Sequence, residues 1–176
     1  MRYFKRLSGF DTLRIVLASK LVLVEGPSDE MLFERAFRNR HGQTPIDAGI
    51  DVLSMAGVSL ARALELSAAL DRQVAGIRDN DGKAASHWEA KVTAHLQPGK
   101  RELFIGDPAK GRTLEPQLID VNGDAAIRAL LVITDDEKTT LDWMTDNKTE
   151  TALVLAESPT SIKFPEYLMK AIEFVE

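Results

Sequence analysis

Short apolar runs alternate with amphipathic segments over the first two thirds of the chain. The apolar runs are rich in branched and aromatic residues, and between them apolar residues recur every three or four positions, a spacing typical of helices. The predicted strands are Lys20–Glu25, Ile50–Met55, Val74–Arg78 and Glu102–Ile105, and the helices that follow the first three are predicted at 29–40, 59–70 and 83–96. Strands that alternate with helices of this length form right-handed crossover units, so the pattern predicts an α/β fold with a mostly parallel sheet flanked by helices.

The two ends of the chain follow a different pattern. Residues 3–18 carry apolar side chains at helical spacing and predict a helical lead-in over 1–19, ahead of a domain over 20–176. After about residue 113 almost every segment is typical of a helix, so the C-terminal third is predicted to be mainly helical. The helices predicted there are 113–119, 124–131, 136–146, 149–157 and 165–175.

Composition narrows the classes of function. The chain has 176 residues, 44% hydrophobic and 28% charged, with 22 basic and 27 acidic side chains and a net charge of −5. This length and composition predict one compact globular domain. The absence of Cys excludes a disulfide scaffold, a thiolate nucleophile and any Cys-ligated metal site. No apolar run approaches the length of a membrane span and no signal peptide is evident, so we expect no membrane partner and a cytoplasmic protein.

Acidic side chains follow the predicted strands at the points where ligands usually bind. Glu25 ends the first strand and Asp29 lies one turn later, Asp79 and Asp81 follow the third strand, and Glu115 comes soon after the fourth. The carboxyl ends of parallel strands share one edge of the sheet, so these carboxylates are predicted to converge there.

Each acid also has an ordinary structural explanation. Asp29 suits the start of a helix, and Asn80-Asp81-Gly82 is a typical turn sequence. Taken together, oxygen ligands gathered without a neutralising Lys or Arg would repel one another unless a cation such as Mg²⁺ or Mn²⁺ lay among them. The joint pattern therefore favours a metal site.

The acidic segments resemble a known signature. Glu25-Gly26-Pro27-Ser28-Asp29 after one hydrophobic strand, and Asp79-Asn80-Asp81-Gly82 after another, resemble the Toprim motifs of topoisomerases, primases and certain nucleases. Within Toprim proteins, the chain is most similar to the C-terminal region of the OLD (overcoming lysogenization defect) nucleases, and the resemblance covers nearly the whole chain. The segments that carry it are 21–26, 113–115, 147–152 and 165–168.

The resemblance implies a Rossmann-type Toprim catalytic domain over 20–176 that hydrolyses DNA as an endonuclease with two divalent cations, Mg²⁺ or Mn²⁺. Lys148 would lie close to the scissile phosphate and act with three catalytic acids. OLD proteins carry an ATPase domain before this region, so the resemblance implies DNA and an upstream ATPase domain as partners. It implies the metal-site acids Glu25, Asp29, Asp79, Asp81 and Glu115, of which Glu25, Asp79 and Asp81 would be catalytic together with Lys148.

A nucleotide hydrolase of the P-loop type is one alternative. Residues 106–113 lie between a strand and a helix and nearly reproduce a phosphate-binding loop, and 130–135 would supply the partner strand. Arg112 stands where that loop needs Lys, and Pro108 removes an amide donor from its centre, so the match is incomplete.

The other alternative is a non-catalytic nucleic-acid-binding module in which the acids hold a structural metal or none. Considered without the resemblance, Lys148 is an ordinary solvated lysine, and the basic residues are scattered rather than clustered.

Trp88 and Trp143 occupy apolar positions of predicted helices, so we expect both in the core.

Overall fold

The computed structural model describes residues 9–55, 60–134 and 137–176. The predicted lead-in helix is present as α1 (Gly9–Leu17), and the part of that prediction over 3–8 lies outside the described residues. Residue 59, the predicted start of one helix, and residues 135–136 also lie outside them.

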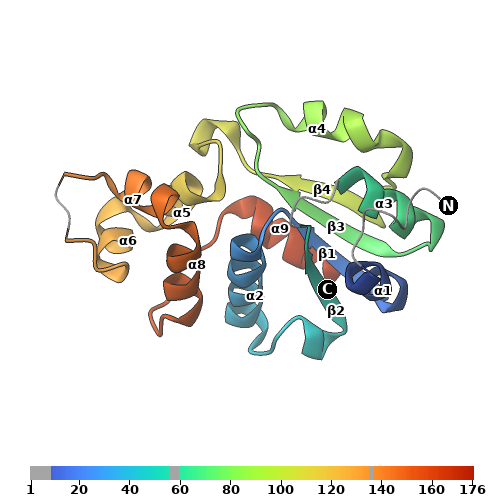
Figure 1. Ribbon diagram of the computed structural model, residues 1–176, viewed down its shortest axis with the longest axis horizontal. Coiled ribbons are helices and arrows are strands. Elements are labelled where there is room, and N and C mark those ends of the chain that lie inside the picture. Colours follow the sequence, from blue (N-terminus) through green and yellow to red (C-terminus); the bar gives the residue numbers. More distant parts are fainter. Residues whose placement is uncertain (1–8, 56–59, 135–136) are drawn as a thin grey trace.

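Four parallel strands form the sheet at the centre of Figure 1. They are β1 (Lys20–Val24), β2 (Ile50–Ser54), β3 (Gln73–Arg78) and β4 (Arg101–Ile105), in the spatial order β2-β1-β3-β4. β1 pairs with both β2 and β3, with Val22 opposite Val52 on one side and Ala75 on the other. The predicted α/β class and parallel sheet are therefore confirmed, with strand ends within two residues of those expected.

The sheet is buried on both faces because alternate side chains of each strand point to opposite sides. Val22 and Val24 of β1 join the apolar cluster that includes α2 (Pro27–His41) and α9 (Glu166–Val175). Leu21 and Leu23 point to the other face, into the cluster formed with α1 and α3 (Leu60–Ala69). Two helical layers thus enclose the strands and fix the edge at which β1 and β3 end.

The helix after β3 differs from its prediction over 83–96. α4 (Ala85–Val92) is shorter, and a 3-10 turn, η3 (Thr93–His95), continues it. Trp88 of α4 is only partly buried and belongs to neither apolar cluster, so its expected place in the core is wrong. Trp143, in contrast, packs against the core cluster on the α2 face.

The C-terminal third is mainly helical, as predicted. The helices are α5 (Leu114–Asn122), α6 (Asp124–Leu130), α7 (Thr140–Asp146) and α8 (Lys148–Glu157), and they lie together beside the sheet, at the left of Figure 1. α7 begins at Thr140 rather than near residue 136 because the Thr139 hydroxyl accepts the Asp142 amide at 3.1 Å and caps the helix. α9 returns to the sheet and packs on β3 and β4.

Arg35 joins these helices to the sheet domain. This buried side chain of α2 donates to the carbonyl oxygens of Ala156 and Ser158, at 2.8 and 2.6 Å, and to that of Thr160 at 3.2 Å. A guanidinium at the C-terminal end of α8 satisfies carbonyls that the helix leaves unpaired and complements its dipole. Arg35 therefore fixes α8 against α2 and, through α8, the position of Lys148 at the opposite end of the helix.

Among the described residues, no helix has the length and apolar character needed to cross a bilayer.

Candidate active site

The order in which the chain adds strands to the sheet reverses next to β1, between β1 and β3. After β1 the chain crosses to β2 on one side, and after β2 it crosses back to β3 on the other side of β1. Ligands in open parallel sheets bind at the carboxyl ends of the strands at such a reversal. Glu25 directly follows β1 and Asp79 directly follows β3, so two of the predicted acids lie at this point.

Asp29 is held at the first turn of α2. Its carboxylate accepts the Gly26 amide at 2.9 Å, which closes a capping interaction at the helix start, and Pro27 occupies the first helical position. The Gly-Pro break after β1 thus turns the chain into α2 and places Asp29 next to the edge where β1 ends.

Asn80 shapes the loop that carries Asp79 and Asp81. Its side chain is fully buried, accepts the Gly82 amide at 2.7 Å and donates to the Gly111 carbonyl at 2.6 Å. Asp81 and Gly82 both have left-handed backbone conformations, with φ of 51° and 77°, as the predicted turn requires. The turn leaves Asp79 partly buried and Asp81 exposed.

Arg78 neutralises part of the acidic cluster. Its guanidinium lies 2.9 Å from a Glu25 carboxylate oxygen and 3.1 Å from an Asp81 oxygen. The expectation that the acids are gathered without a neutralising Lys or Arg is therefore wrong. Because Arg78 is the last residue of β3, its side chain reaches across to the end of the neighbouring β1.

Lys148 also lies within the cluster. Its ammonium nitrogen is 3.2 Å from Glu115 Oε1, which joins the start of α8 to the first turn of α5. Glu115 is buried, and its second oxygen, Oε2, has no hydrogen-bond partner among the described residues. A buried carboxylate oxygen without a partner is costly, so Oε2 is a position at which a cation or a water would be stabilised.

The acids act strongly on one another. Burial and the charges of Asp29, Glu25 and Glu115 raise the pKa of Asp79 to about 8, against the opposing charge of Lys148. Burial and, more weakly, the charges of neighbouring acids also raise the pKa values of Glu25 and Asp29. Asp79 is therefore largely protonated at neutral pH in the metal-free chain.

The negative charges of the acids favour the ionised form of Lys148, whereas they disfavour the ionised forms of one another. Burial disfavours its ammonium form, but the charge and hydrogen bond of Glu115, with the charges of Asp79 and Asp29, outweigh burial and raise the pKa of Lys148. Lys148 consequently stays cationic wherever the acids are ionised.

The carboxylates of the site are suitable ligands for a hard divalent cation, but in the structure several of them contact Arg78 or Lys148 instead. Carboxylate oxygens are the ligands that Mg²⁺ and Mn²⁺ prefer, and Glu115 offers a buried oxygen without a partner. In the described part of the chain, no three acidic or His side chains are placed to hold one metal ion as they stand. Glu25 and Asp81 contact Arg78, and Glu115 contacts Lys148. A metal would have to displace these contacts.

Tyr167 is a member of the site to which sequence reasoning assigned no role. It is buried at the start of α9, and burial together with the charges of Asp79, Asp29 and Glu115 raises its pKa well above 10. Tyr167 thus remains a neutral phenol beside the acids. The segment 165–168 carried part of the family resemblance, but nothing in its pattern indicated that the final helix returns to this edge of the sheet.

The loop over 106–113 is not arranged to bind a phosphate. The Asp107 amide donates to Gln117 Oε1 at 3.1 Å, and the amides of Ala109 and Lys110 donate to the side chain and carbonyl of Asp107. A P-loop needs such amides to point at the phosphates. The predicted partner strand over 130–135 is also absent from its described part, 130–134, where α6 ends at Leu130 and an irregular segment follows.

Comparison with known proteins agrees with this arrangement. Residues 16–81, which include β1 to β3 and the acids Glu25, Asp29, Asp79 and Asp81, match the family model described as "Overcoming lysogenization defect protein-like, TOPRIM domain". The resemblance to the OLD-like Toprim family is confirmed. No curated protein matches the chain significantly.

Three solved structures of OLD C-terminal regions share the fold. That of the Burkholderia pseudomallei OLD protein has a TM-score of 0.68 at 19% identity and covers 90% of this chain and 97% of its own. Two structures from Xanthomonas campestris pv. campestris, phased with platinum and with iodine, have TM-scores of 0.61 and 0.59 at 18% identity. They cover 92% and 90% of this chain, and each is covered over 94% of its own length. The OLD-like Toprim fold thus extends over the helical C-terminal third as well.

Proposed function

We propose that the chain is a divalent-metal-dependent DNA endonuclease, in which Mg²⁺ or Mn²⁺ is held at the carboxyl ends of β1 and β3. The observation that carries the proposal is the meeting of acids from β1, α2, the β3–α4 loop and α5 at the reversal of the sheet, with Lys148 beside them. The Toprim family, whose name the matched model bears, supports a nucleic acid as the substrate.

The acids are proposed to hold two cations together. Burial and, after it, repulsion by Asp29, Glu25 and Glu115 raise the pKa of Asp79 to about 8. A doubly charged ion bound among these acids would oppose both effects and favour the ionised carboxylate. Two bound cations would activate a water and stabilise the leaving 3′-oxygen. The proposed ligand residues are Glu25, Asp29, Asp79, Asp81 and Glu115.

Lys148 is proposed to contact the scissile phosphate. Its side chain is half-exposed, so the ammonium can turn from Glu115 toward a substrate. A cation that meets charge developing on the phosphoryl oxygens lowers the barrier to their displacement. Arg35 acts only indirectly, because it fixes the far end of α8.

DNA and an upstream ATPase domain are the proposed partners. The matched structures are C-terminal regions of OLD proteins, which supports a further domain ahead of residue 1 in the complete protein. On this proposal α1 would lie close to the connection with that domain.

Plasmid cleavage tests the proposal directly. Supercoiled plasmid is incubated with the purified chain in Mg²⁺, Mn²⁺, Ca²⁺ or EDTA, and nicked and linear products are separated on a gel. We expect cleavage in Mg²⁺ or Mn²⁺, none in EDTA, and loss of activity in Glu25→Gln and Asp79→Asn. Glu157→Gln, which removes an exposed carboxylate at the other end of α8, is the matched control and should cleave at the parental rate. Parental activity in folded Glu25→Gln and Asp79→Asn would contradict the proposal.

A non-catalytic binding module is the second candidate, and the ion pairs of Arg78 favour it. A chain that already neutralises Glu25 and Asp81 can fold without a metal. Binding of DNA with no cleavage in any of the four conditions would select this candidate.

A further inference from the structure

Trp88 lies among cations rather than in the core. Its indole nitrogen donates to the Asn80 carbonyl at 2.9 Å, which fixes the ring against the β3–α4 loop. The Arg78 guanidinium carbon is 3.4 Å from the ring centroid, and the Lys91 ammonium nitrogen is 3.9 Å from it. Cations are attracted to an aromatic face, so Trp88 gathers two positive charges at one place.

Further basic groups lie near this ring or on the loop beside it. The His87 ring packs edge-on against Trp88, with centroids 4.9 Å apart, and desolvation and the charges of Lys91, Lys83 and Arg78 lower the pKa of His87. Arg112 approaches from the 106–113 loop and donates to the Asp81 carbonyl at 3.2 Å. Lys83, Lys91 and Arg112 thus come together from separate segments, and we call these three residues the basic rim.

The basic rim is exposed and carries excess positive charge. All three side chains are exposed, and none forms an ion pair with a carboxylate within 9–55, 60–134 and 137–176. Surface lysines elsewhere are often paired, as Lys100 is with Asp71 at 2.5 Å. Glu89 is the only acidic residue within α4. In a chain of net charge −5, this excess of positive charge is local, and no carboxylate of the described residues is paired with it.

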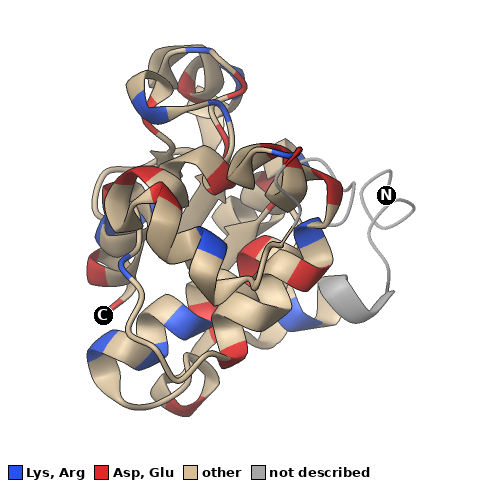
Figure 2. Cartoon of the chain, turned by 90° about the vertical axis from the view of Figure 1, so that its left-hand side faces the viewer, with Lys and Arg blue, Asp and Glu red and all other residues tan. Residues whose placement is uncertain are grey.

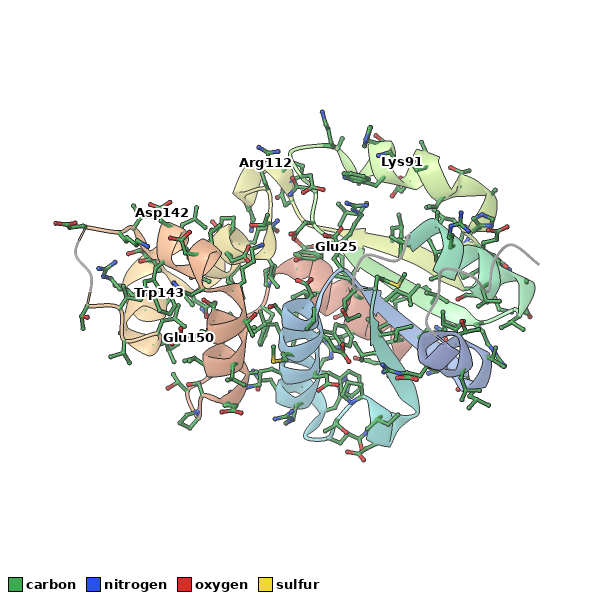
Figure 3. The ribbon with its side chains drawn as sticks, viewed as in Figure 1. Glu25, Lys91, Arg112, Asp142, Trp143 and Glu150 are labelled. Atoms are coloured by element: carbon green, nitrogen blue, oxygen red, sulfur yellow. The ribbon has the colours of Figure 1, made fainter. Side chains whose placement is uncertain are left out.

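Arg78 links the basic rim to the acidic cluster. Arg78 contacts Trp88 and, with the same guanidinium, Glu25 and Asp81, so the rim and the acidic cluster meet at one side chain. In Figure 3, Lys91 and Arg112 lie along the upper edge of the molecule, above Glu25. On the side formed by α5 to α8, basic and acidic segments are instead intermingled (Figure 2).

We propose that Lys83, Lys91 and Arg112 bind backbone phosphates of DNA that flank the cleaved bond, and so hold the strand against the acidic cluster. The proposal rests on the proposed nuclease function. An acidic cluster repels a polyanion, so a nuclease of this charge needs a separate cationic surface to hold its substrate. Exposed cations without carboxylate partners meet that need, because binding a phosphate breaks no ion pair in the protein.

The strength of this binding follows from counterion release. Each phosphate neutralised on duplex DNA adds about 0.9 to the slope of the logarithm of affinity against the logarithm of salt concentration. Near 0.1 M salt, one such contact corresponds to roughly a tenfold change in affinity. Losing two contacts should therefore weaken binding by roughly 100-fold and reduce the slope by about 1.8.

The test measures affinity apart from cleavage. A fluorescent 20-bp duplex is titrated with the intact chain in EDTA, and the dissociation constant is determined by anisotropy between about 50 and 200 mM salt. We compare the parent with Lys83→Gln/Lys91→Gln and with Arg112→Gln. Lys83→Arg/Lys91→Arg keeps the charge and should keep the slope. Lys100→Gln is the matched control, because Lys100 precedes β4 and lies at the opposite edge of the sheet.

The expected result is weaker binding and a smaller salt slope in Lys83→Gln/Lys91→Gln, a smaller loss in Arg112→Gln, and parental values for Lys100→Gln. Thermal melts of each variant check that the exposed substitutions leave the fold intact. Parental affinity and slope in the double variant, equal losses in Lys100→Gln, or a parent chain without salt-dependent binding would each overturn the proposal. Binding that depends on the basic rim, with no cleavage in Mg²⁺ or Mn²⁺, would instead refute the nuclease function and keep only the DNA-binding part of this inference.

Discussion

Replacement of Asp79 by Asn should stabilise the metal-free chain, and the gain should depend on pH. The pKa of Asp79 is raised from its ordinary value of 3.8 to about 8, first by burial and then by the charges of Asp29, Glu25 and Glu115. A carboxyl group with a higher pKa in the folded chain than in the unfolded chain destabilises the folded chain above the unfolded pKa. The penalty begins near pH 4, grows until about pH 8 and is constant above it.

The pKa difference sets an upper limit on the effect. Each tenfold change in acid strength is worth about 1.4 kcal/mol, so the limit is about 6 kcal/mol above pH 8. Asp79 is only partly buried and its neighbours can move apart, so we expect about 2–4 kcal/mol. Asn has nearly the same shape and no charge, and it therefore removes the penalty without opening a cavity. At pH 4 the gain should fall to within about 1 kcal/mol of zero.

Urea unfolding in EDTA at pH 4 and pH 8.5 measures both values. Asp120→Asn is the control, since Asp120 is exposed and paired with Lys110, and its loss should cost at most about 1 kcal/mol at pH 8.5. Addition of Mn²⁺ at a hundredfold excess over its dissociation constant should stabilise the parent by about 2.7 kcal/mol and Asp79→Asn by much less. If Asp79→Asn is no more stable than the parent at pH 8.5 in EDTA, burial and the neighbouring acids do not disfavour the ionised form of Asp79 as described.

Two further substitutions separate chemistry from architecture. Lys148→Ala should reduce single-turnover cleavage by 10- to 1000-fold, or about 1.4–4 kcal/mol of transition-state stabilisation, while stabilisation by Mn²⁺ stays nearly unchanged. Lys148→Arg should restore part of the rate, and a parental rate in Lys148→Ala would remove Lys148 from the site. Arg35→Met should lower the free energy of unfolding by about 2–4 kcal/mol because carbonyl groups at the end of α8 lose their donor, whereas Met at the exposed Arg38 should cost less than about 0.5 kcal/mol. Equal values for the two Met variants, measured by urea unfolding, would contradict the role given to Arg35.

The fold could be predicted because its signals are local. Each strand is a short apolar run that ends at a turn residue, and Gly26-Pro27 marks the change from β1 to α2 in the sequence itself. The acids that follow β1 and β3 inherit their positions from the sheet, so parallel topology alone brings Glu25 and Asp79 to one edge. Helix ends were less predictable, since the cap at Thr139 depends on a single side-chain hydrogen bond.

The counter-ions of the site could not be predicted because they depend on contacts between distant segments. Arg78 ends a strand and carries no motif, and only the pairing of β3 with β1 brings it to Glu25. Trp88 has the helical spacing of a core residue, but Val92 is the residue of α4 that joins an apolar cluster, and Trp88 belongs to neither cluster. Helical spacing alone therefore did not show which residue of α4 is buried. Tyr167 reaches the acids because α9 returns to the sheet, and the periodicity of a helix does not indicate where the helix packs.

Arg78 determines how the metal-free site differs from a site that holds a cation. Five acids at one edge are tolerated in the metal-free chain because Arg78 and Lys148 neutralise some of them and Asp79 is largely protonated. A divalent cation bound by Glu25 and Asp81 would compete with the guanidinium for the same oxygens. The described contacts of Arg78 that such an ion leaves untouched are its hydrogen bond to the Asp79 carbonyl and its contact with Trp88, beside the basic rim. Binding of a cation would therefore release positive charge toward the surface that we propose binds DNA, so metal binding and DNA binding should strengthen each other.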